Sequence, residues 1–338
     1  MDTIFCTLFD TGYLDKAFVL IDSMEKRINA FKLYAFCFDD ISYNIITNEK
    51  FNNVIPISLH ELESFFPCLK DAKKDRNAVE YNWTCSAWTI KFVIEHYGEK
   101  ICTYIDADMK FFSSPEFVFA KMREAKQSVI IVPHRFRSDE FEKEEGPLTG
   151  FYCVEFNTFI NNENGMKALN WWADNCLKWC HYVIPSIQQW YGDQKYLNEF
   201  PLKFDGVHVC DDYGVGLGPW NDNRMLFESQ DTTNVILKDK DSNIKYPLVL
   251  YHYAGVRFLS KSIVVVSSQM KSGKLHKIVF DQYVKDIVKK RNEIKTKYGI
   301  SLATGIKALS KNPLVFIYQK YITPIKKLKK IHNVYFIK

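Results

Sequence analysis

The stretch "ICTYIDADMKFFSSPEFVF", Ile101–Phe119, contains the pattern that decides the expected fold. It begins with an apolar segment, Ile101–Ile105, that is typical of a buried strand. Asp106 and Asp108 follow at once, so two carboxylates lie at the carboxyl end of this strand, where open α/β sheets place their ligand crevice. Such a pair is costly unless a positive charge compensates it. The stretch therefore raises the hypothesis of a bound metal ion.

Strand and helix patterns alternate on both sides of this stretch. The turn at 113–116 predicts a helix with Ser114 as its cap and Pro115 in its first position. Alternation of this length implies an α/β protein with a mostly parallel sheet and helices on both faces. The expected strands are Asp2–Phe9, Lys32–Phe38, Val54–Leu59, Ile101–Ile105, Ser128–Val132, Val207–Cys210 and Pro247–Tyr251, and the expected helices are Tyr13–Ile28, Glu61–Lys74, Asn77–Tyr97, Met166–Trp179 and Asp193–Glu199.

Length and composition indicate a folded protein without a membrane-spanning helix. The 338 residues, 47% hydrophobic, suffice for one large α/β domain with an extension. No apolar run reaches the length of a transmembrane helix, and the first ten residues lack the basic region of a secretory signal. Nine scattered cysteines are best explained as reduced, buried thiols of a cytosolic protein. A zinc site using Cys176, Cys180 and Cys210 is the less favoured alternative.

Charge is distributed unevenly along the chain. Residues 271–338 hold 17 Lys and Arg against 3 Asp and Glu, whereas residues 1–270 hold 28 against 37. We therefore expect one main domain at 1–265 and a basic, mostly helical extension at 266–338. The end of this extension, Tyr318–Lys338, mixes lysine pairs with apolar side chains, which suits an anionic membrane surface. Pro324 predicts two short helices there, and a basic helix packed on the acidic body is the alternative. No RNA-binding motif is present, so nucleic acid is not an expected partner.

Two later stretches carry candidate ligand-binding residues. "YGDQKYLNEFP", Tyr191–Pro201, places Asp193 and Gln194 at the start of a short helix, where an aspartate can also serve only as a cap. "GVGLGPWN" at 214–221 is a glycine-rich loop in which the backbone at Gly216 and Gly218 can approach a ligand closely. An ordinary turn is the alternative for this loop.

A third stretch, "LVLYHYAG" at 248–255, places His252 at the end of an apolar strand. A histidine there is either a core residue or a ligand. The Asp-x-Asp pair has a clear use in holding a divalent cation that neutralises a nucleotide diphosphate. Phosphatases of the haloacid dehalogenase type also place Asp-x-Asp after an apolar strand. These phosphatases carry the motif near the N-terminus, with Thr or Val two residues after the second aspartate. This chain has Lys110 at that position, so the phosphatase interpretation is disfavoured.

Taken in order, these motifs resemble the GT-A fold sugar transferases of bacteria, akin to glycosyltransferase family 8 with its glycogenin-like and galactosyltransferase-like enzymes. The likeness spans residues 1 to about 258, and the order of the motifs makes it specific. It implies a Rossmann-like mixed sheet with flanking helices. It is carried by "VEYNWTCSAWTIKFVIEHYGEKICTYIDADMKFFSSPEFVF" (Val79–Phe119), "NENGMKALNWWADNCLKWC" (Asn162–Cys180), "GDQKYLNEFP", "GLGPWN" and "YHYAG".

The resemblance implies roles for individual residues. Asp106, Asp108 and His252 become the ligands of Mn²⁺, with Mg²⁺ as the other option, and their oxygen and imidazole donors suit Mn²⁺. Asp193 and Gln194 resemble the Asp-Gln pair beside the transferred sugar and are the catalytic candidates. The remaining residues expected to contact the nucleotide sugar are Thr7, Phe9, Thr11, Tyr81, Thr84, Gly216, Gly218 and Arg257, together with Asp106.

The expected activity is a metal-dependent hexosyl transfer from a nucleotide-diphosphate sugar, most simply a UDP-sugar, to a glycan or lipid-linked acceptor. Such a reaction fits the assembly of surface polysaccharide or lipopolysaccharide at the cytoplasmic face of the membrane. The family 8 likeness favours retention of configuration. A non-catalytic protein that binds nucleotide sugars or glycans through the same fold is the alternative.

Overall fold

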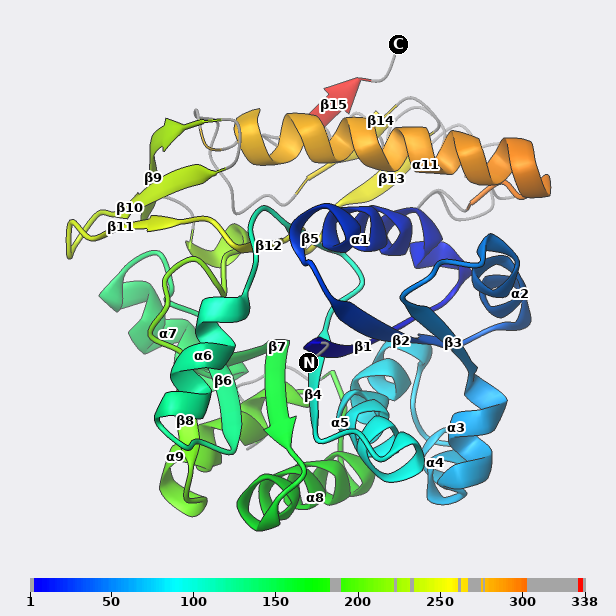
Figure 1. Ribbon diagram of the computed structural model, residues 1–338, viewed down its shortest axis with the longest axis horizontal. Helices are drawn as coiled ribbons and strands as arrows, with labels where there is room; N and C mark the ends of the chain where they lie inside the picture. Colours follow the sequence, from blue (N-terminus) through cyan, green and yellow to red (C-terminus); the bar gives the residue numbers. More distant parts are fainter. Residues whose placement is uncertain are drawn as a thin grey trace, which may run out of the picture.

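The chain forms a mixed α/β structure around one seven-stranded sheet (Figure 1). The computed structural model describes residues 3–182, 190–221, 224–231, 234–260, 263–266, 275, 277–302 and 334–336. The four neighbouring strands β3, β2, β1 and β4 run parallel to one another. β7 is antiparallel to its neighbours β4 and β6, and β8 is parallel to β6. In sheet order the strands are β3 (Val54–Ser58), β2 (Phe31–Cys37), β1 (Thr3–Phe9), β4 (Ile101–Ile105), β7 (Tyr152–Ile160), β6 (Val129–Pro133) and β8 (Val207–Val209).

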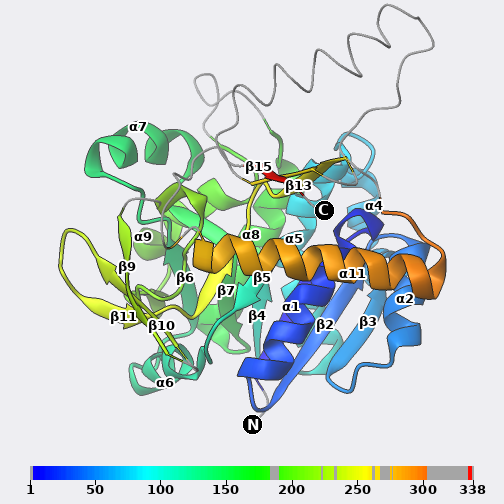
Figure 2. The ribbon, with the colours of Figure 1, turned by 90° about the horizontal axis from the view of Figure 1, so that it is seen from above.

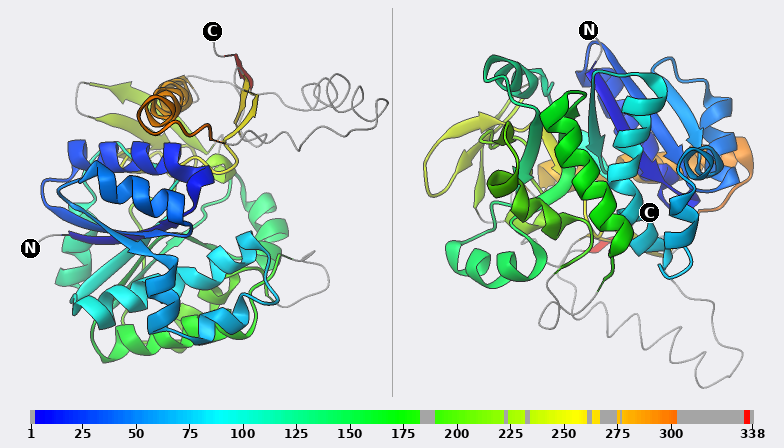
Figure 3. Two further views of the ribbon diagram at one scale, coloured as in Figure 1. Left: turned by 90° about the vertical axis from the view of Figure 1, so that its right-hand side faces the viewer. Right: turned by 90° about the horizontal axis from the view of Figure 1, so that it is seen from below.

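Helices cover both faces of this sheet, which confirms the predicted α/β class. Figures 1 and 3 show α1, α2 and α11 on one side and α3, α4, α5 and α8 on the other. The helices are α1 (Leu14–Arg27), α2 (Asp40–Glu49), α3 (Leu59–Phe65), α4 (Cys68–Ala72), α5 (Ala78–Tyr97), α6 (Glu116–Glu124), α7 (Asp139–Thr149), α8 (Glu163–Lys178), α9 (Phe200–Lys203) and α11 (Gln282–Tyr298), with 3₁₀ turns η1 (Thr11–Tyr13), η2 (Gln194–Glu199) and η3 (Pro219–Asn221).

The central strands are buried on both faces, and their alternating side chains enter two separate core layers. In β1, Cys6 and Leu8 pack in the layer formed with α5 and α8. Phe5 and Phe9 pack in the opposite layer, which α1 and α6 cover. Alternation with a period of two therefore produces the three-layer arrangement directly from the apolar strand sequence.

Three local expectations were wrong in detail. The helix expected at Glu61–Lys74 is divided into α3 and α4, because Pro67 cannot continue the first helix and stands at the cap of the second. Helix α6 starts one residue later than expected, with Pro115 at its N-cap position. Strand β7 was not expected, because its polar residues interrupt the apolar pattern.

A short two-stranded sheet fixes the position of the Asp-x-Asp segment. β5 (Met109–Phe111) pairs antiparallel with β12 (Leu250–His252), and Met109 lies opposite His252 in the register. The backbone N–H of Tyr253 donates to the carbonyl of Asp108 over 2.9 Å. Two segments that lie far apart in the sequence are thus held side by side at the carboxyl end of β4.

The remaining strands form two further small sheets at the periphery. β11 (Lys245–Pro247), β10 (Val235–Asp239) and β9 (Met225–Gln230) form one sheet, and β13 (Arg257–Ser260), β14 (Ile263–Val265) and β15 (Val334–Phe336) form the other. β15 lies within the extension at 266–338, whose mostly helical character stays a prediction. The rest of the basic tail, with its expected helices, lies outside the described residues.

Helix α11 confirms the helical pattern expected after residue 275 and packs on the main body of the protein. A π-helical turn, η4 (Lys277–Asp281), precedes it. Figure 2 shows α11 lying across α1. Arg291 donates to Asp15 Oδ2 over 2.8 Å and to the carbonyl of Leu302 over 2.6 Å. Within the described part of the chain, no helix is long and apolar enough to span a membrane.

The Arg291–Asp15 pair should be a main attachment of α11. Asp15 is 1% exposed, so removing the guanidinium leaves a buried carboxyl without an ion-pair partner among the described residues. We expect Arg291→Met to lower the free energy of unfolding by about 3 kcal/mol, measured by chemical denaturation. Adding Asp15→Asn should recover part of that loss, because the amide needs no counter-charge. Equal destabilisation in the single and double variants would contradict this assignment.

Candidate active site

Asp106, Asp108 and His252 come together at the carboxyl end of β4. His252 Nε2 lies 3.1 Å from Asp108 Oδ1 and 3.7 Å from Asp106 Oδ2. The hydroxyl of Tyr104 donates to Asp106 Oδ1 over 2.9 Å. The two aspartates follow directly on β4, whereas His252 ends β12 and arrives through the pairing of β12 with β5. The structure therefore brings together the three residues that the sequence grouped as a metal set.

Glu155 fixes the orientation of His252 from below. It comes from β7, is fully buried, and its Oε2 lies 2.9 Å from His252 Nδ1. A carboxyl oxygen accepts a hydrogen bond here, which assigns a proton to Nδ1 and directs Nε2 at the aspartates. Its other oxygen, Oε1, has no hydrogen-bond partner among the described residues. Cys153 completes a cluster with Glu155 and His252 whose donor atoms lie within 4.8 Å of one another.

The protonation of this group follows from its burial and its charges. Burial alone would lower the pKa of His252, but the negative charge of Asp108 and hydrogen bonds with Asp108, Cys153 and Glu155 raise that pKa well above 6.5. Burial raises the pKa of Asp108, yet His252 and Lys16 outweigh it and hold this pKa below its ordinary value. Burial raises the pKa of Asp106 to about 7, with His252 opposing this and Asp108 adding to it.

Lys16 supplies a fixed positive charge beside the aspartates. Its Nζ lies 3.7 Å from Asp108 Oδ2 and 3.7 Å from the centre of the Tyr13 ring. Only 10% of the side chain is exposed. Burial alone would lower the pKa of Lys16, but Asp108, Tyr13 and Asp15 raise it, so the ammonium stays charged. Such a group can contact an anionic ligand that binds at Asp108.

The residues at this point fit a divalent cation. Two carboxylates and one imidazole give the mixed oxygen and nitrogen donors that Mn²⁺ accepts. The hydrogen bond from His252 to Glu155 is the outer contact that ligating histidines usually make. Glu155 is fully buried behind the imidazole, whereas Asp106 keeps 30% of its side chain exposed toward the cavity. Asp106, Asp108 and His252 as metal ligands, with Glu155 orienting the imidazole, therefore stay a prediction.

A cavity of about 480 Å³ opens beside this cluster. Asp106, His252, Asp193 and Gln194 all line it, so the Asp-Gln pair that the sequence singled out reaches the same cavity as the Asp-x-Asp pair. Its volume is within the range of small-molecule sites. Aromatic side chains form much of its wall: Trp83, Phe136, Phe141, Tyr191 and Trp220.

Asp193 is held in this wall by groups other than a helix cap. It occupies the N-cap position of η2, but its side chain makes no capping hydrogen bond, so the capping explanation is not supported. Trp172 donates to its backbone carbonyl over 2.9 Å, and its Oδ2 lacks a hydrogen-bond partner within the described chain. Burial raises the pKa of Asp193 to about 7, a hydrogen bond with Ser86 opposes this, and Asp106 adds to it. Gln194 donates from Nε2 to the carbonyl of Thr149 over 2.7 Å.

The expected nucleotide contacts on β1 lie at the same edge of the sheet. Thr7 is fully buried, and its hydroxyl has no hydrogen-bond partner among the described residues. Thr11 donates from both its N–H and its hydroxyl to Asp39, over 2.7 and 2.6 Å. The ring of Phe9 is buried in the core. None of the three lines the 480 Å³ cavity, so their contact with a nucleotide stays a prediction.

Helix α5 does reach the cavity, but through residues other than those expected. The hydroxyl of Tyr81 donates to Glu63 over 2.9 Å, and that of Thr84 donates to the carbonyl of Glu80 over 2.8 Å. Trp83 and Ser86, on the neighbouring face of the helix, line the cavity instead. Contact of Tyr81 and Thr84 with the donor therefore stays a prediction.

Close packing explains why the loop at 214–221 has glycine at positions 216 and 218. Gly216 has a φ of +87°, and a Cβ there would lie 2.4 Å from Val132 Cγ1. A Cβ on Gly218 would lie 2.5 Å from the Trp220 ring, which in turn packs edge-on against His252 at 5.3 Å. The loop thus holds Trp220 over the imidazole. Arg257, at the start of β13, is exposed and does not line the cavity.

Some of the residues at this site escaped the sequence reasoning. Glu155 lies on the unexpected strand β7, and Lys16 lies in the first turn of α1, so neither stands next to a motif. His134 also lines the cavity, and burial lowers its pKa to about 4, which keeps it neutral. The aromatic walls come from several unrelated segments. The polar residues at the ends of β4 and β12 and the pair Asp193 and Gln194 carried a local signal.

The cysteines that suggested zinc lie apart. Cys176 and Cys180 are buried in the core layer with α5 and α8, and Cys210 is buried in the opposite layer. Among the described residues, these three form no metal-binding cluster. These three cysteines are buried free thiols, as expected.

Comparisons with known proteins found two uncharacterized sequence relatives and several solved structures of low similarity. No protein-family model matches the chain. YfnD of Bacillus subtilis (strain 168), an uncharacterized protein, is 27% identical over 261 residues, which cover 76% of this chain and 79% of YfnD. YfnF of the same organism, also uncharacterized, is 28% identical over 267 residues, which cover 77% and 84%.

Among solved structures, glycosyltransferase GlyE of Streptococcus pneumoniae TIGR4 matches with a TM-score of 0.48 and 13% identity, covering 91% of this chain and 67% of GlyE. The WbbM bifunctional glycosyltransferase matches with a TM-score of 0.48 and 11% identity, covering 88% of this chain and 51% of WbbM. TM-scores below 0.5 do not establish a common fold.

The buried carboxyl of Asp193 should make stability depend on pH. Its pKa rises from 3.8 to about 7 on folding, so between these values the folded state holds the extra proton and stability falls as pH rises. Asp193→Asn removes this loss. Without metal, we expect the variant to be more stable than the wild type by on the order of 2–4 kcal/mol near about pH 8.

The difference in stability between Asp193→Asn and the wild type should disappear as the pH falls toward 4. Denaturation curves across the pH range would measure it. Asp174→Asn, on an exposed position of α8, is the matched control and should change little. A stability difference that does not vary with pH would refute the buried-carboxyl explanation.

Proposed function

We propose that this chain is a metal-dependent glycosyltransferase of the GT-A type, related to family 8. It would move a hexose-type sugar from a nucleotide-diphosphate sugar, most simply a UDP-sugar, to a glycan or lipid-linked acceptor. One observation carries the proposal. The Asp106–Asp108–His252 group and the Asp193–Gln194 pair line or border one cavity with aromatic walls.

Each part of this arrangement has a use in sugar transfer. Asp106, Asp108 and His252 would hold Mn²⁺ or Mg²⁺. When bound, the cation would neutralise the diphosphate and stabilise the charge that it gains as the sugar departs. The ammonium of Lys16, beside Asp108, would add a second positive contact for the same diphosphate.

The remaining residues would bind and orient the sugars. Asp193 and Gln194 present polar atoms to the cavity next to Asp106, which suits hydrogen bonds to sugar hydroxyls. Because the pKa of Asp193 is raised to about 7, its carboxyl can donate or accept a proton near neutral pH. The rings of Trp83, Tyr191 and Trp220 offer flat apolar surfaces on which sugar rings pack, and they reduce the access of water.

The acceptor and the location follow from the same proposal. A glycan or lipid-linked acceptor would place the enzyme in surface polysaccharide or lipopolysaccharide assembly, at the cytoplasmic face of the membrane. The lysine-rich segment after residue 302 supports this location by its composition. A retaining outcome remains part of the proposal through the family 8 likeness. A protein that binds nucleotide sugars without turnover is the second candidate, because a binding site can keep the same polar cavity.

The metal assignment predicts a large effect of a small change at Asp108. The wild type should release UDP from at least one UDP-sugar in a panel only when Mn²⁺ or Mg²⁺ is present. Asp108→Asn should lower kcat/KM by at least about 100-fold, because the lost cation provides several kcal/mol of charge stabilisation. Asp174→Asn should keep wild-type activity. Full turnover with a chelator present, or an active Asp108→Asn variant, would contradict the assignment.

The UDP-release assay, combined with calorimetry, separates the two candidate functions. An enzyme should bind and cleave a UDP-sugar, whereas a binding protein should show metal-dependent binding by calorimetry and no UDP release. Binding of Mn²⁺ itself should strengthen as pH rises, since the imidazole of His252 must lose a proton before Nε2 can ligate.

Asp193 provides a second prediction, about the sugar rather than the diphosphate. Asp193→Asn should lower kcat by at least about tenfold while the Kd for UDP with Mn²⁺ stays near the wild-type value. Steady-state kinetics and calorimetry on the same preparation would measure both. The variant is expected to be the more stable protein near neutral pH, so unfolding would not explain lost turnover. An equal loss of UDP binding would assign Asp193 a structural role.

A further inference from the structure

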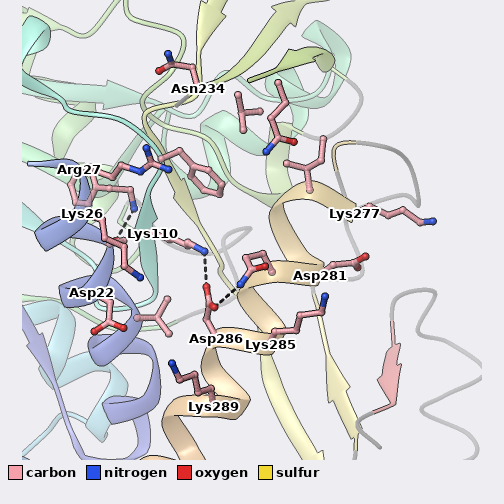
Figure 4. Close-up of a pocket in the computed structure, with 18 of the residues that line it drawn as sticks. Asp22, Lys26, Arg27, Lys110, Asn234, Lys277, Asp281, Lys285, Asp286 and Lys289 are labelled. Atoms are coloured by element: carbon pink, nitrogen blue, oxygen red, sulfur yellow. Dashed lines mark hydrogen bonds and ion pairs between the residues drawn. The ribbon is translucent and has the colours of Figure 1, made fainter. Parts of the chain in front are cut away.

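A second cavity, lined by lysines, lies between α1, β5, the β9–β10 connection and α11 (Figure 4). Its volume is about 480 Å³, and it shares no lining residue with the aromatic cavity. We call it the basic cleft and define it by the six lysines that line it: Lys26, Lys110, Lys277, Lys285, Lys289 and Lys290.

The charges of the basic cleft do not cancel. With Arg27, seven cationic side chains line it, against the four carboxyls of Asp22, Asp231, Asp281 and Asp286. Two of these carboxyls already have lysine partners. Lys110 Nζ lies 2.6 Å from Asp286 Oδ2, and Lys290 Nζ lies 2.7 Å from Asp22 Oδ2. An excess of positive charge therefore remains in a concave site.

The remaining lysines that line the cleft come from different elements. Lys26 belongs to α1, whereas Lys285 and Lys289 lie one helical turn apart on α11. Lys26 and Lys285 make no ion pair with another residue in the described ranges, and Lys289 has only a long contact of 3.7 Å with Glu293. Figure 4 shows these three side chains around the cavity, together with the Lys110–Asp286 pair.

We propose that the basic cleft binds a multiply charged phosphate group of diphosphate size. One anion with several oxygens can accept contacts from several of the ammonium groups that line the cleft, and lysine is a common point-charge ligand of phosphate. The volume suits a small group of this kind. The same chemistry belongs to a soluble diphosphate and to a phosphorylated lipid headgroup. The site is separate from the donor cavity, so it does not depend on the function proposed for that cavity.

The test removes Lys26, Lys285 and Lys289 from the cleft and keeps Lys110, Lys277 and Lys290. The cleft variant is Lys26→Gln, Lys285→Gln and Lys289→Gln in one chain. The control variant is Lys70→Gln, Lys143→Gln and Lys167→Gln, which removes the same charge from exposed positions outside the cleft. All six substituted positions are exposed, and melting curves would establish that both variants are folded.

Two probes distinguish the sources of the phosphate. Calorimetry with pyrophosphate, in buffer with EDTA so that no metal bridges it to Asp106 and Asp108, tests a soluble anion. Sedimentation with phosphatidylcholine vesicles, with and without phosphatidic acid, tests a lipid headgroup. All three proteins keep the basic C-terminal segment, so its contribution to vesicle binding is the same.

We expect the cleft variant to lose affinity for at least one probe by about tenfold or more, because three ammonium–phosphate contacts each contribute a few-fold. The control should stay near the wild type, and added salt should weaken binding. Loss with pyrophosphate identifies a soluble anion, and loss confined to phosphatidic acid vesicles identifies a lipid headgroup. The proposal is overturned if the wild type binds neither probe, if both variants weaken equally, or if only Asp108→Asn abolishes pyrophosphate binding.

Discussion

The pairing of β5 with β12 is the constraint on which the candidate site depends. It sets His252 opposite Met109 and ties Tyr253 to the carbonyl of Asp108, so the imidazole must lie beside the two carboxylates that end β4. The arrangement concentrates negative charge at one sheet edge, and in the protein alone it is balanced by the charged His252 and by Lys16. A bound cation would take over part of this balance.

The site also contains polar groups that stability alone would not retain. Glu155 Oε1 and Asp193 Oδ2 are buried without hydrogen-bond partners among the described residues, and such groups destabilise a fold unless a ligand satisfies them. Both lie next to the Asp106–Asp108–His252 group. The aromatic residues around Asp193 deepen this effect, because they exclude water that would otherwise solvate the carboxyl. Perturbed groups gathered in one cavity are a common mark of functional sites.

Helix α11 links this site to the surface on the opposite side of β5. Arg291 attaches the helix to Asp15, which precedes Lys16 of the site, and Lys110 of β5 pairs with Asp286 of the helix. The extension expected as a separate segment thus contributes helix α11 to the wall of the basic cleft. Carboxyl groups line the aromatic cavity, whereas cationic side chains outnumber carboxyls in the basic cleft.

The sequence by itself determined most strands of the central sheet, the Asp-x-Asp pair at the end of β4 and the histidine at the end of β12, because these signals are local and repeat with the period of a strand or helix. It did not determine Glu155 beneath His252 or Lys16 beside Asp108. Those contacts join residues 97 and 92 positions apart, from His252 to Glu155 and from Asp108 to Lys16. Only the tertiary structure decides them, because the sheet order and the β5–β12 register, rather than any local pattern, set which distant side chains meet.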